Sequence, residues 1–208
     1  MTVLSDKTIS ALCMEKERPM IVPFFGRSVK ERSGVKVASY GLSTAGYDIR
    51  AAGEFMVFKP IKYTLWERLK HLFTGTPKPV SPLSYKNITP DLFDRVIASE
   101  VVVQPGGFLL ARSMEYVDMP RDVVAVCIGK STIARAGWNC LCTPIEPGWD
   151  GYITLEFQNT TDRPNIFYAE EGCLQLMFHQ LDQDPKTSYK DRGGKYLNQA
   201  PEIVLPRV

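Results

Sequence analysis

The sequence predicts a mainly β fold, either a sandwich or a barrel. Short runs rich in valine, isoleucine, tyrosine and phenylalanine follow one another along the chain, and glycine and proline separate them at intervals typical of such folds. Residues 151–159 alternate strictly between apolar and polar side chains, as a strand does when one of its faces is buried. The runs that we expect to form strands are 35–42, 47–58, 99–105, 107–117, 122–129, 151–159 and 172–181.

The composition is that of an ordinary globular protein. Hydrophobic residues make up 44% of the 208 residues and charged residues 23%, which excludes wholesale disorder. The formal net charge of +2 gives no reason to expect a nucleic-acid or membrane partner. The N-terminal segment carries acidic residues and lacks the apolar core of a signal peptide, and no stretch is long and apolar enough for a spanning helix. We therefore expect a soluble, cytoplasmic protein.

Two helices are expected outside the β runs. Ser5 or Asp6 can cap the first, in which Ile9 and Cys13 have helical spacing and which Pro19 ends. The second lies in an insertion near 60–82, where Leu65, Leu69, Leu72 and Phe73 form an apolar stripe. Residues 59–79 hold five basic residues against one acidic residue. A basic helix of this kind can bind an anion or a partner, but a solvated insertion packed on the body by its leucines is the commoner case and is expected here.

The cysteines predict neither a disulfide framework nor a zinc site. Their number is odd, they are scattered, and neither His71 nor His179 has cysteines at ligand spacing. We interpret the thiols as small buried apolar groups. They are Cys13, Cys127, Cys140, Cys142 and Cys173.

The segment from 129 to 159 carries the residues best suited to chemistry. GKST at 129–132 follows a predicted strand and opens a helical turn, where backbone N–H groups, hydroxyls and a lysine can hold phosphate oxygens, although the spacing is not that of a P-loop. Arg135 lies four residues after Ser131, so a helical turn places both side chains on one face.

Glu156 is the candidate base. In 151–159 the apolar side chains point towards a core, and Glu156 points to the opposite face together with Tyr152, Thr154 and Gln158. The preceding loop, PIEPGWDG, has the composition of a pocket wall. A carboxylate shielded by such a wall would have a raised pKa and could act as a base near neutral pH, whereas the alternative is an acid that simply faces solvent.

Several blocks of the chain resemble the dCTP deaminases of the deoxyuridine triphosphatase superfamily. The resemblance covers nearly the whole chain except the insertion, and it implies a single domain over 1–208 with a distorted β-barrel or jelly-roll fold and a few short helices. It also implies homotrimers with active sites between subunits. Trp138 and Cys140 stand where other members tend to carry smaller or aliphatic residues. The matching blocks are STAGYDIR (43–50), GKSTIARAG (129–137), TPIEPGWDGYITLEFQN (143–159), SYKDRGGKYLNQ (188–199), LSDKTI (4–9) and VLPRV (204–208).

The resemblance implies hydrolytic deamination of dCTP to dUTP and ammonia, a step that supplies dUTP for dUMP and dTTP synthesis. Glu156 would activate water for attack on C4 of cytosine, Ser131 would position that water, and Arg135 would favour the ionised glutamate. No zinc is expected, since the HxE…PCxxC signature of the zinc deaminases is absent from the sequence. Further nucleotide contacts are implied for Lys130, Thr132, Glu146, Thr154, Leu155, Gln175, Tyr189, Lys195 and Gln199.

The same resemblance predicts how the triphosphate is held and regulated. Mg²⁺ would be bound through the substrate phosphates rather than by a protein cage. The C-terminal segment near 186–208 would close over the phosphates as a lid, with Gly193 and Gly194 as its hinge, whereas a glycine-bearing basic tail is otherwise a flexible terminus. dTTP is expected to inhibit.

Other functions remain open at this point. A bifunctional enzyme that converts dCTP through to dUMP would keep the same serine, arginine and glutamate. A non-catalytic nucleotide sensor that signals through the basic insertion is the alternative from another class. A pure deoxyuridine triphosphatase is disfavoured, because the chain has Glu156 on the strand and DRGGKY in the tail instead of that enzyme's tyrosine and glycine-rich phosphate arm.

Overall fold

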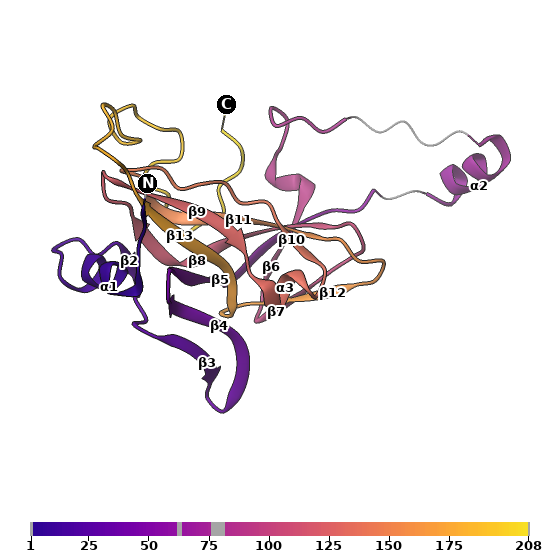
Figure 1. Cartoon of the computed structure of the whole chain (residues 1–208). Helices are drawn as coiled ribbons and strands as arrows, with labels where there is room; N and C mark the ends of the chain where they lie inside the picture. Colours follow the sequence, from indigo (N-terminus) through magenta and orange to yellow (C-terminus); the bar gives the residue numbers. More distant parts are fainter. Residues whose placement is uncertain (1, 62–63, 76–81, 208) are drawn as a thin grey trace.

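The chain folds around one curled antiparallel sheet that carries small helices at its margins (Figure 1). The computed structural model describes residues 2–61, 64–75 and 82–207. The helical elements of this part are α1 (Asp6–Met14), α2 (Leu65–Thr74), a 3-10 turn (Pro90–Leu92) and α3 (Ser131–Ala134). Its strands are β1 (Thr2–Val3), β2 (Ile21–Val22), β3 (Ser28–Arg32), β4 (Val35–Ser43), β5 (Gly46–Phe58), β6 (Phe93–Ile97), β7 (Glu100–Val103), β8 (Phe108–Asp118), β9 (Val123–Gly129), β10 (Trp138–Cys140), β11 (Asp150–Asn159), β12 (Asn165–Tyr168) and β13 (Gly172–Gln180).

Strand β5 joins the two halves of the sheet. Its first part, 46–50, pairs with β4 and β13, and its second part, 51–58, pairs with β6 and β8. The register with β8 shifts between Ala51 and Phe55, so the strand changes partners where its pairing is irregular. Beyond β8 the sheet continues through β11 to β10, and beyond β13 it continues to β1 and β9. β12 and β7 form a separate two-stranded sheet.

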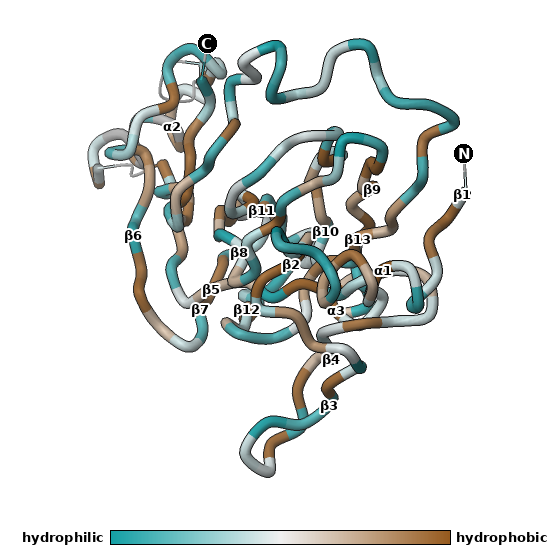
Figure 2. Tube along the Cα trace, turned by 90° about the vertical axis from the view of Figure 1, so that its left-hand side faces the viewer, coloured by the Kyte–Doolittle hydropathy of each residue, from teal (hydrophilic) through white to brown (hydrophobic). Residues whose placement is uncertain are grey.

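The apolar side chains of the long strands meet inside the curl of the sheet. Hydrophobic positions recur along the central strands, whereas the long loops are mainly hydrophilic (Figure 2). The largest fully buried side chains include Tyr47 and Phe55 of β5, Phe157 of β11 and Phe178 of β13. The sheet therefore encloses one main core, and strands on opposite halves of it contribute to that core.

Each run that the sequence assigned to a strand forms one, with ends that differ by a few residues. The mainly β fold is confirmed. The strands that the sequence did not indicate are short or exposed, so their sequences contain no long run of apolar residues. They are β1, β2, β3, β6, β10 and β12. The first helix is also confirmed, with Ile9 and Cys13 buried, but it ends at Met14, well before Pro19, and the Ser5 side chain makes no capping hydrogen bond.

The expectation that the insertion packs on the body through its leucines is wrong for the described part of the insertion. Helix α2 lies at the end of an arm that projects away from the sheet (Figure 1). Leu65 and Leu72 are 74% and 76% exposed, and Trp66 and Phe73 are each 81% exposed. The apolar patch of the sheet beside the arm is already covered by Ile88 and Leu92 and by C-terminal residues, so it leaves no face for the leucines. Lys62 and Lys78 of the basic segment lie outside the described residues.

A buried ion pair connects the two halves of the sheet. Arg50 of β5 donates through Nε to Oε1 of Glu115 on β8 at 2.7 Å, and its backbone N–H donates to Oε2 at 2.9 Å. The Glu115 side chain is 0% exposed and that of Arg50 is 7% exposed. The guanidinium also lies 4.7 Å and 4.6 Å from the ring centroids of Phe25 and Tyr40. Removing either charge would leave the other buried without a partner.

We predict that Glu115→Ala lowers the free energy of unfolding by about 3–5 kcal/mol, because it strands the buried Arg50 guanidinium. Glu115→Gln keeps a hydrogen-bond acceptor and should cost less. Urea denaturation measures both. Arg163→Ala is the control, because Arg163 and its partner Asp162 are 80% and 87% exposed and the change should stay within about 0.5 kcal/mol. Equal urea midpoints for Glu115→Ala and Arg163→Ala would show that the buried pair does not stabilise the fold.

Candidate active site

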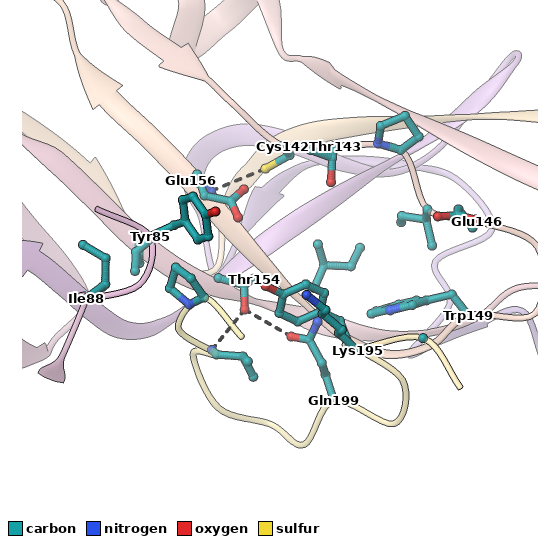
Figure 3. Close-up of a pocket in the computed structure, with 18 of the residues that line it drawn as sticks. Tyr85, Ile88, Cys142, Thr143, Glu146, Trp149, Thr154, Glu156, Lys195 and Gln199 are labelled. Atoms are coloured by element: carbon teal, nitrogen blue, oxygen red, sulfur yellow. Dashed lines mark hydrogen bonds between the residues drawn. The ribbon is translucent and has the colours of Figure 1, made fainter. Parts of the chain in front are cut away.

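A cavity of about 1060 Å³ lies beside the sheet, and its lining includes both polar side chains and members of the two hydrophobic clusters. Its floor is formed by β8 and β11, one wall by the loop of residues 142–149, and another by the segment that returns from the insertion. The C-terminal segment closes part of its mouth. In Figure 3, Thr154 and Glu156 lie between Tyr85 and Ile88 on one side and Glu146 and Trp149 on the other.

Glu156 enters this cavity because β11 has two faces of opposite character. Leu155 and Phe157 are 0% exposed and point into the core, so the side chains between them point into the cavity. β11 lies between β8 and β10 and is not an edge strand. Its backbone at Glu156 is held by the two residues that follow β10: the carbonyl oxygen accepts from the N–H of Leu141 at 3.0 Å, and the N–H donates to Sγ of Cys142 at 3.4 Å.

The surroundings of Glu156 favour its protonated form. Burial raises the pKa of Glu156 from 4.5 to about 6, and a hydrogen bond from the Cys142 thiol offsets part of that rise. The raised pKa that the sequence predicted is therefore confirmed in direction and cause. The predicted pocket wall is confirmed as well, since Pro144, Ile145, Glu146 and Trp149 of PIEPGWDG line the cavity. A carboxyl group with such a pKa can accept and return a proton near neutral pH.

The C-terminal segment is fixed along the cavity by β11. Gln199 forms a parallel bridge with Gly151, and its carbonyl oxygen accepts from the N–H of Tyr152 at 3.0 Å. The Thr154 hydroxyl donates to Oε1 of Gln199 at 3.2 Å and accepts from the N–H of Val204 at 3.1 Å. Gly151 has φ +142°, and a Cβ there would lie 2.6 Å from the Gln199 nitrogen. Only glycine permits this approach of the tail to the strand.

Some of the predicted site residues line the cavity. Glu146 forms an ion pair with Arg192 of the tail at 2.5 Å, and both side chains are 49% exposed. Leu155 does not line the cavity, because its side chain is in the core, so only its backbone is available to a ligand. The predicted residues that do line the cavity are Glu146, Thr154, Glu156, Tyr189, Lys195 and Gln199.

The remaining predicted residues lie outside this cavity and gather around α3. The expected helical turn is confirmed, since the N–H of Arg135 donates to the Ser131 carbonyl oxygen at 3.1 Å. Ser131, Thr132 and Arg135 are exposed, and none of them lines the cavity. Within one chain, therefore, the serine and the arginine do not share a cavity with Glu156.

Lys130 and Gln175 belong to the group around α3. Nζ of Lys130 lies 2.5 Å from Oδ2 of Asp48, and both side chains are largely buried. Gln175 pairs with Asp48 across β13 and β5, and its side chain donates to the Ser43 hydroxyl at 3.2 Å. Oδ1 of Asp48 is buried and has no hydrogen-bond partner among the described residues. This second cluster thus combines a lysine, two exposed hydroxyls and an exposed arginine.

Sequence reasoning missed the thiols beside Glu156. Cys142 lines the cavity and contacts Glu156, and Cys140 hydrogen-bonds to Cys142. Cys142 does pack against the main core, as the interpretation of the thiols expected, but that interpretation left out its contact with Glu156. The signal was the pair of cysteines two residues apart in CLC at 140–142, directly before the pocket wall. Tyr85 and Ile88 were also missed, because nothing in the sequence shows that the end of the insertion folds back over β11.

Among the described residues, no group of three or more His, Cys, Asp or Glu side chains is arranged to hold a metal ion. None of the described helices has the length and apolar character needed to cross a membrane.

Comparison with known proteins gives consistent matches. A family model described as dCTP deaminase-like matches residues 3–181. The proteins named dCTP deaminase from Dechloromonas aromatica (strain RCB) and Janthinobacterium sp. (strain Marseille) are 45% and 43% identical to this chain, over 100% of the chain and 100% of each relative. A crystal structure of 2'-deoxycytidine 5'-triphosphate deaminase from Agrobacterium tumefaciens matches 84% of this chain with a TM-score of 0.54 and 16% identity. The match spans only 45% of that solved chain, and it concerns the fold.

We predict that Gly151→Ala detaches the C-terminal segment from β11, because the added methyl group would collide with the Gln199 backbone. Limited trypsin digestion should then cut within 186–207 at least about tenfold faster than in the wild type, since release exposes the local backbone. Gly106→Ala is the matched control: Gly106 also has positive φ, at +69°, but its Cβ would meet nothing within 4 Å. A tail equally resistant to trypsin in Gly151→Ala and Gly106→Ala would contradict the prediction.

Proposed function

The chain belongs to the dCTP deaminase-like family, and on that premise we propose that it hydrolyses dCTP to dUTP and ammonia. The observation that carries the proposal is Glu156, a carboxyl group that faces the cavity and whose pKa burial raises to about 6. Such a group can take a proton from water and return it later in the same cycle. The relatives named dCTP deaminase, which align with the whole chain, support the choice of substrate.

In the proposed reaction Glu156 accepts a proton from a water molecule, and the resulting hydroxide attacks C4 of cytosine. The proton passes to the ring nitrogen, and the tetrahedral intermediate then releases ammonia, protonated through the same carboxyl group. The carboxylate replaces the zinc ion by which other deaminases activate water. Thr154 and the backbone of Leu155 on the same strand would orient the base, and Glu146 of the cavity wall would lie near the sugar.

We propose that a second copy of the chain completes the site. In this proposal the cavity holds the base, but it lacks Ser131 and Arg135, which are exposed at the first residue of α3 and directly after its last residue. A cyclic arrangement such as a homotrimer would bring α3 of one copy to the cavity of the next, and each interface would then contain one complete set. Arg135 of the neighbouring copy would lower the pKa of Glu156, and Ser131 would position the water.

The triphosphate would lie between the α3 segment and the C-terminal segment. One copy would contact the phosphates through Lys130, Ser131 and Thr132. The C-terminal segment of the other copy would contact them through Tyr189 and Lys195. Mg²⁺ would enter as part of the substrate, bound to the phosphate oxygens. In this view residues 186–208 act as a lid on a single domain, and dTTP, which shares the triphosphate and the pyrimidine ring, competes for the site. The free thiols and the nucleotide substrate fit a cytoplasmic location.

We predict that Glu156→Gln, which keeps the size of the side chain but cannot act as a base, lowers turnover by about 10²- to 10⁴-fold while dCTP still binds. An ammonia-release assay with dCTP and Mg²⁺, followed by separation of the nucleotides, measures this. Ammonia with dUTP supports the proposed activity. Ammonia with dUMP and pyrophosphate would indicate the bifunctional enzyme, and dCTP binding without ammonia in the wild type would indicate a sensor. A near-normal rate in Glu156→Gln would mean that another group is the base.

We predict that Arg135→Ala lowers kcat at least about tenfold and moves the acid limb of the kcat/KM profile upward, towards pH 6. A neighbouring cation lowers the pKa of a carboxylate, so its loss leaves the value of about 6 that burial gives Glu156. Because Glu156 must be ionised to accept a proton, activity is lost as the pH falls through that value. An Arg135→Ala enzyme with an unchanged acid limb would make the arginine structural.

Co-expression of the two variants tests where Arg135 comes from. If each site takes Glu156 from one copy and Arg135 from the next, mixed oligomers of Glu156→Gln and Arg135→Ala chains regain intact sites. About a quarter of the sites would be intact in a random equal mixture. A site is intact only when its Glu156 comes from an Arg135→Ala chain and its Arg135 comes from a Glu156→Gln chain, and each of these occurs about half of the time. Doubly tagged mixed oligomers that stay as inactive as the separate variants would place Glu156 and Arg135 of each site in the same chain.

A further inference from the structure

Two thiols lie against the segment that holds Glu156. Cys140 is the last residue of β10, and Cys142 follows it after one residue, so the two side chains emerge from the same side of an extended segment. Their thiols hydrogen-bond to each other. Both residues are partly exposed, and Cys142 also lines the cavity, so a small solute in the cavity reaches the Cys142 member of the pair. The chemistry described above makes no use of either thiol.

The backbone that carries the two cysteines also positions Glu156. Cys142 accepts the backbone N–H of Glu156 through Sγ at 3.4 Å, and Leu141, between the cysteines, donates its N–H to the Glu156 carbonyl oxygen at 3.0 Å. The Cys142 thiol also lies close enough to the Glu156 carboxyl group to lower its pKa. Any movement of residues 140–142 therefore changes the surroundings of that carboxyl group directly.

We propose that Cys140 and Cys142 form an oxidation site at which hydroperoxides close a disulfide and displace Glu156. The site itself rests on the arrangement of the thiols, and its effect on turnover rests on the proposed deaminase function. The substrate class is a small hydroperoxide, ROOH, that reaches the partly exposed Cys140.

The reaction balances as an oxidation of two thiols by one hydroperoxide. The Cys140 thiolate attacks the peroxide, the O–O bond breaks, ROH leaves, and Cys140 becomes a sulfenic acid. Sγ of Cys142 then attacks that sulfur, forms the S–S bond and releases water. The hydrogen bond from Cys142 lowers the pKa of Cys140, which favours Cys140 as the attacking thiolate and Cys142 as the thiol that resolves the sulfenic acid.

Closure of the disulfide requires a local bend. Alternate residues of an extended segment have Cα atoms about 6.6 Å apart, near the upper limit of about 6.8 Å for a disulfide, whose usual value is about 5.5–6 Å. The segment must therefore shorten at Leu141. The paired part of β10 ends at Cys140, and the backbone of Leu141 is held to β11 by its hydrogen bond to Glu156. The bend would break the Leu141 hydrogen bond and take the Cys142 thiol away from the Glu156 carboxyl group. Loss of this positioning lowers turnover.

The test treats the purified full-length chain with hydrogen peroxide, blocks the remaining thiols with N-ethylmaleimide and measures intact mass, peptide masses and ammonia release. We expect a loss of about 2 Da before alkylation, two fewer alkylated thiols, and a disulfide mapped to Cys140 and Cys142. Ammonia release should fall at least about tenfold, and dithiothreitol should restore both the mass and the activity.

Cys140→Ser and Cys142→Ser remove the pair, and each is compared with its own untreated activity. Neither variant should form the disulfide, and neither should show a loss of activity that dithiothreitol reverses. Cys127→Ser is the matched control, since Cys127 is a third partly buried thiol near Glu156 but not a member of the pair, and it should respond like the wild type. A disulfide elsewhere, sulfinic acid without a disulfide, or equal reversible inactivation of Cys140→Ser and wild type would overturn the proposal. The mass measurement shows whether the disulfide forms even if the wild type releases no ammonia. Failure of the proposed oxidation site can therefore be distinguished from failure of the proposed deaminase function.

Discussion

The position of β11 between β8 and β10 is the constraint on which the rest of the site depends. Pairing on both sides fixes the strand, and its strict alternation sends Leu155 and Phe157 into the core while Glu156 points the other way. A shift of the register by one residue would exchange these faces. Because the neighbouring side chains anchor the strand in the core, Glu156 keeps its place in a cavity that partly excludes water, and that exclusion raises its pKa.

The same strand also fixes the C-terminal segment of the chain. Gly151 and Thr154 hold the C-terminal segment through Gln199 and Val204, so the segment that closes the cavity and the carboxyl group inside it are fixed to one element. The ion pair of Arg50 and Glu115 connects β5 to β8, the strand next to β11, and thereby stabilises the sheet beneath the cavity. Stability and site geometry are thus coupled through neighbouring strands.

The division of the predicted residues into two clusters gives the proposed assembly its physical basis. The cavity offers a shielded carboxyl group and surfaces for a base, whereas α3 and Lys130 offer hydroxyls and cations suited to phosphate. The proposed trimer joins them at an interface, and the proposed thiol switch acts on the half that holds Glu156, so assembly and oxidation would control the same carboxyl group by different means.

The sequence by itself determined the strands and the identity of the candidate base. Alternation along 151–159 and the length of the apolar runs are local properties, so they predicted β11 and the orientation of Glu156 without knowledge of the fold. Similarity of the motifs supplied the other site residues. Local patterns could not show that α2 stays away from the body, because its packing depends on whether the sheet leaves an apolar face uncovered, and C-terminal residues Ile203 and Leu205 cover that face. Nor could they show that Cys140 and Cys142 lie beside Glu156, or that Ser131 and Arg135 do not share its cavity. Those facts follow from which strands pair across long separations in the chain, and only the tertiary structure decides that pairing.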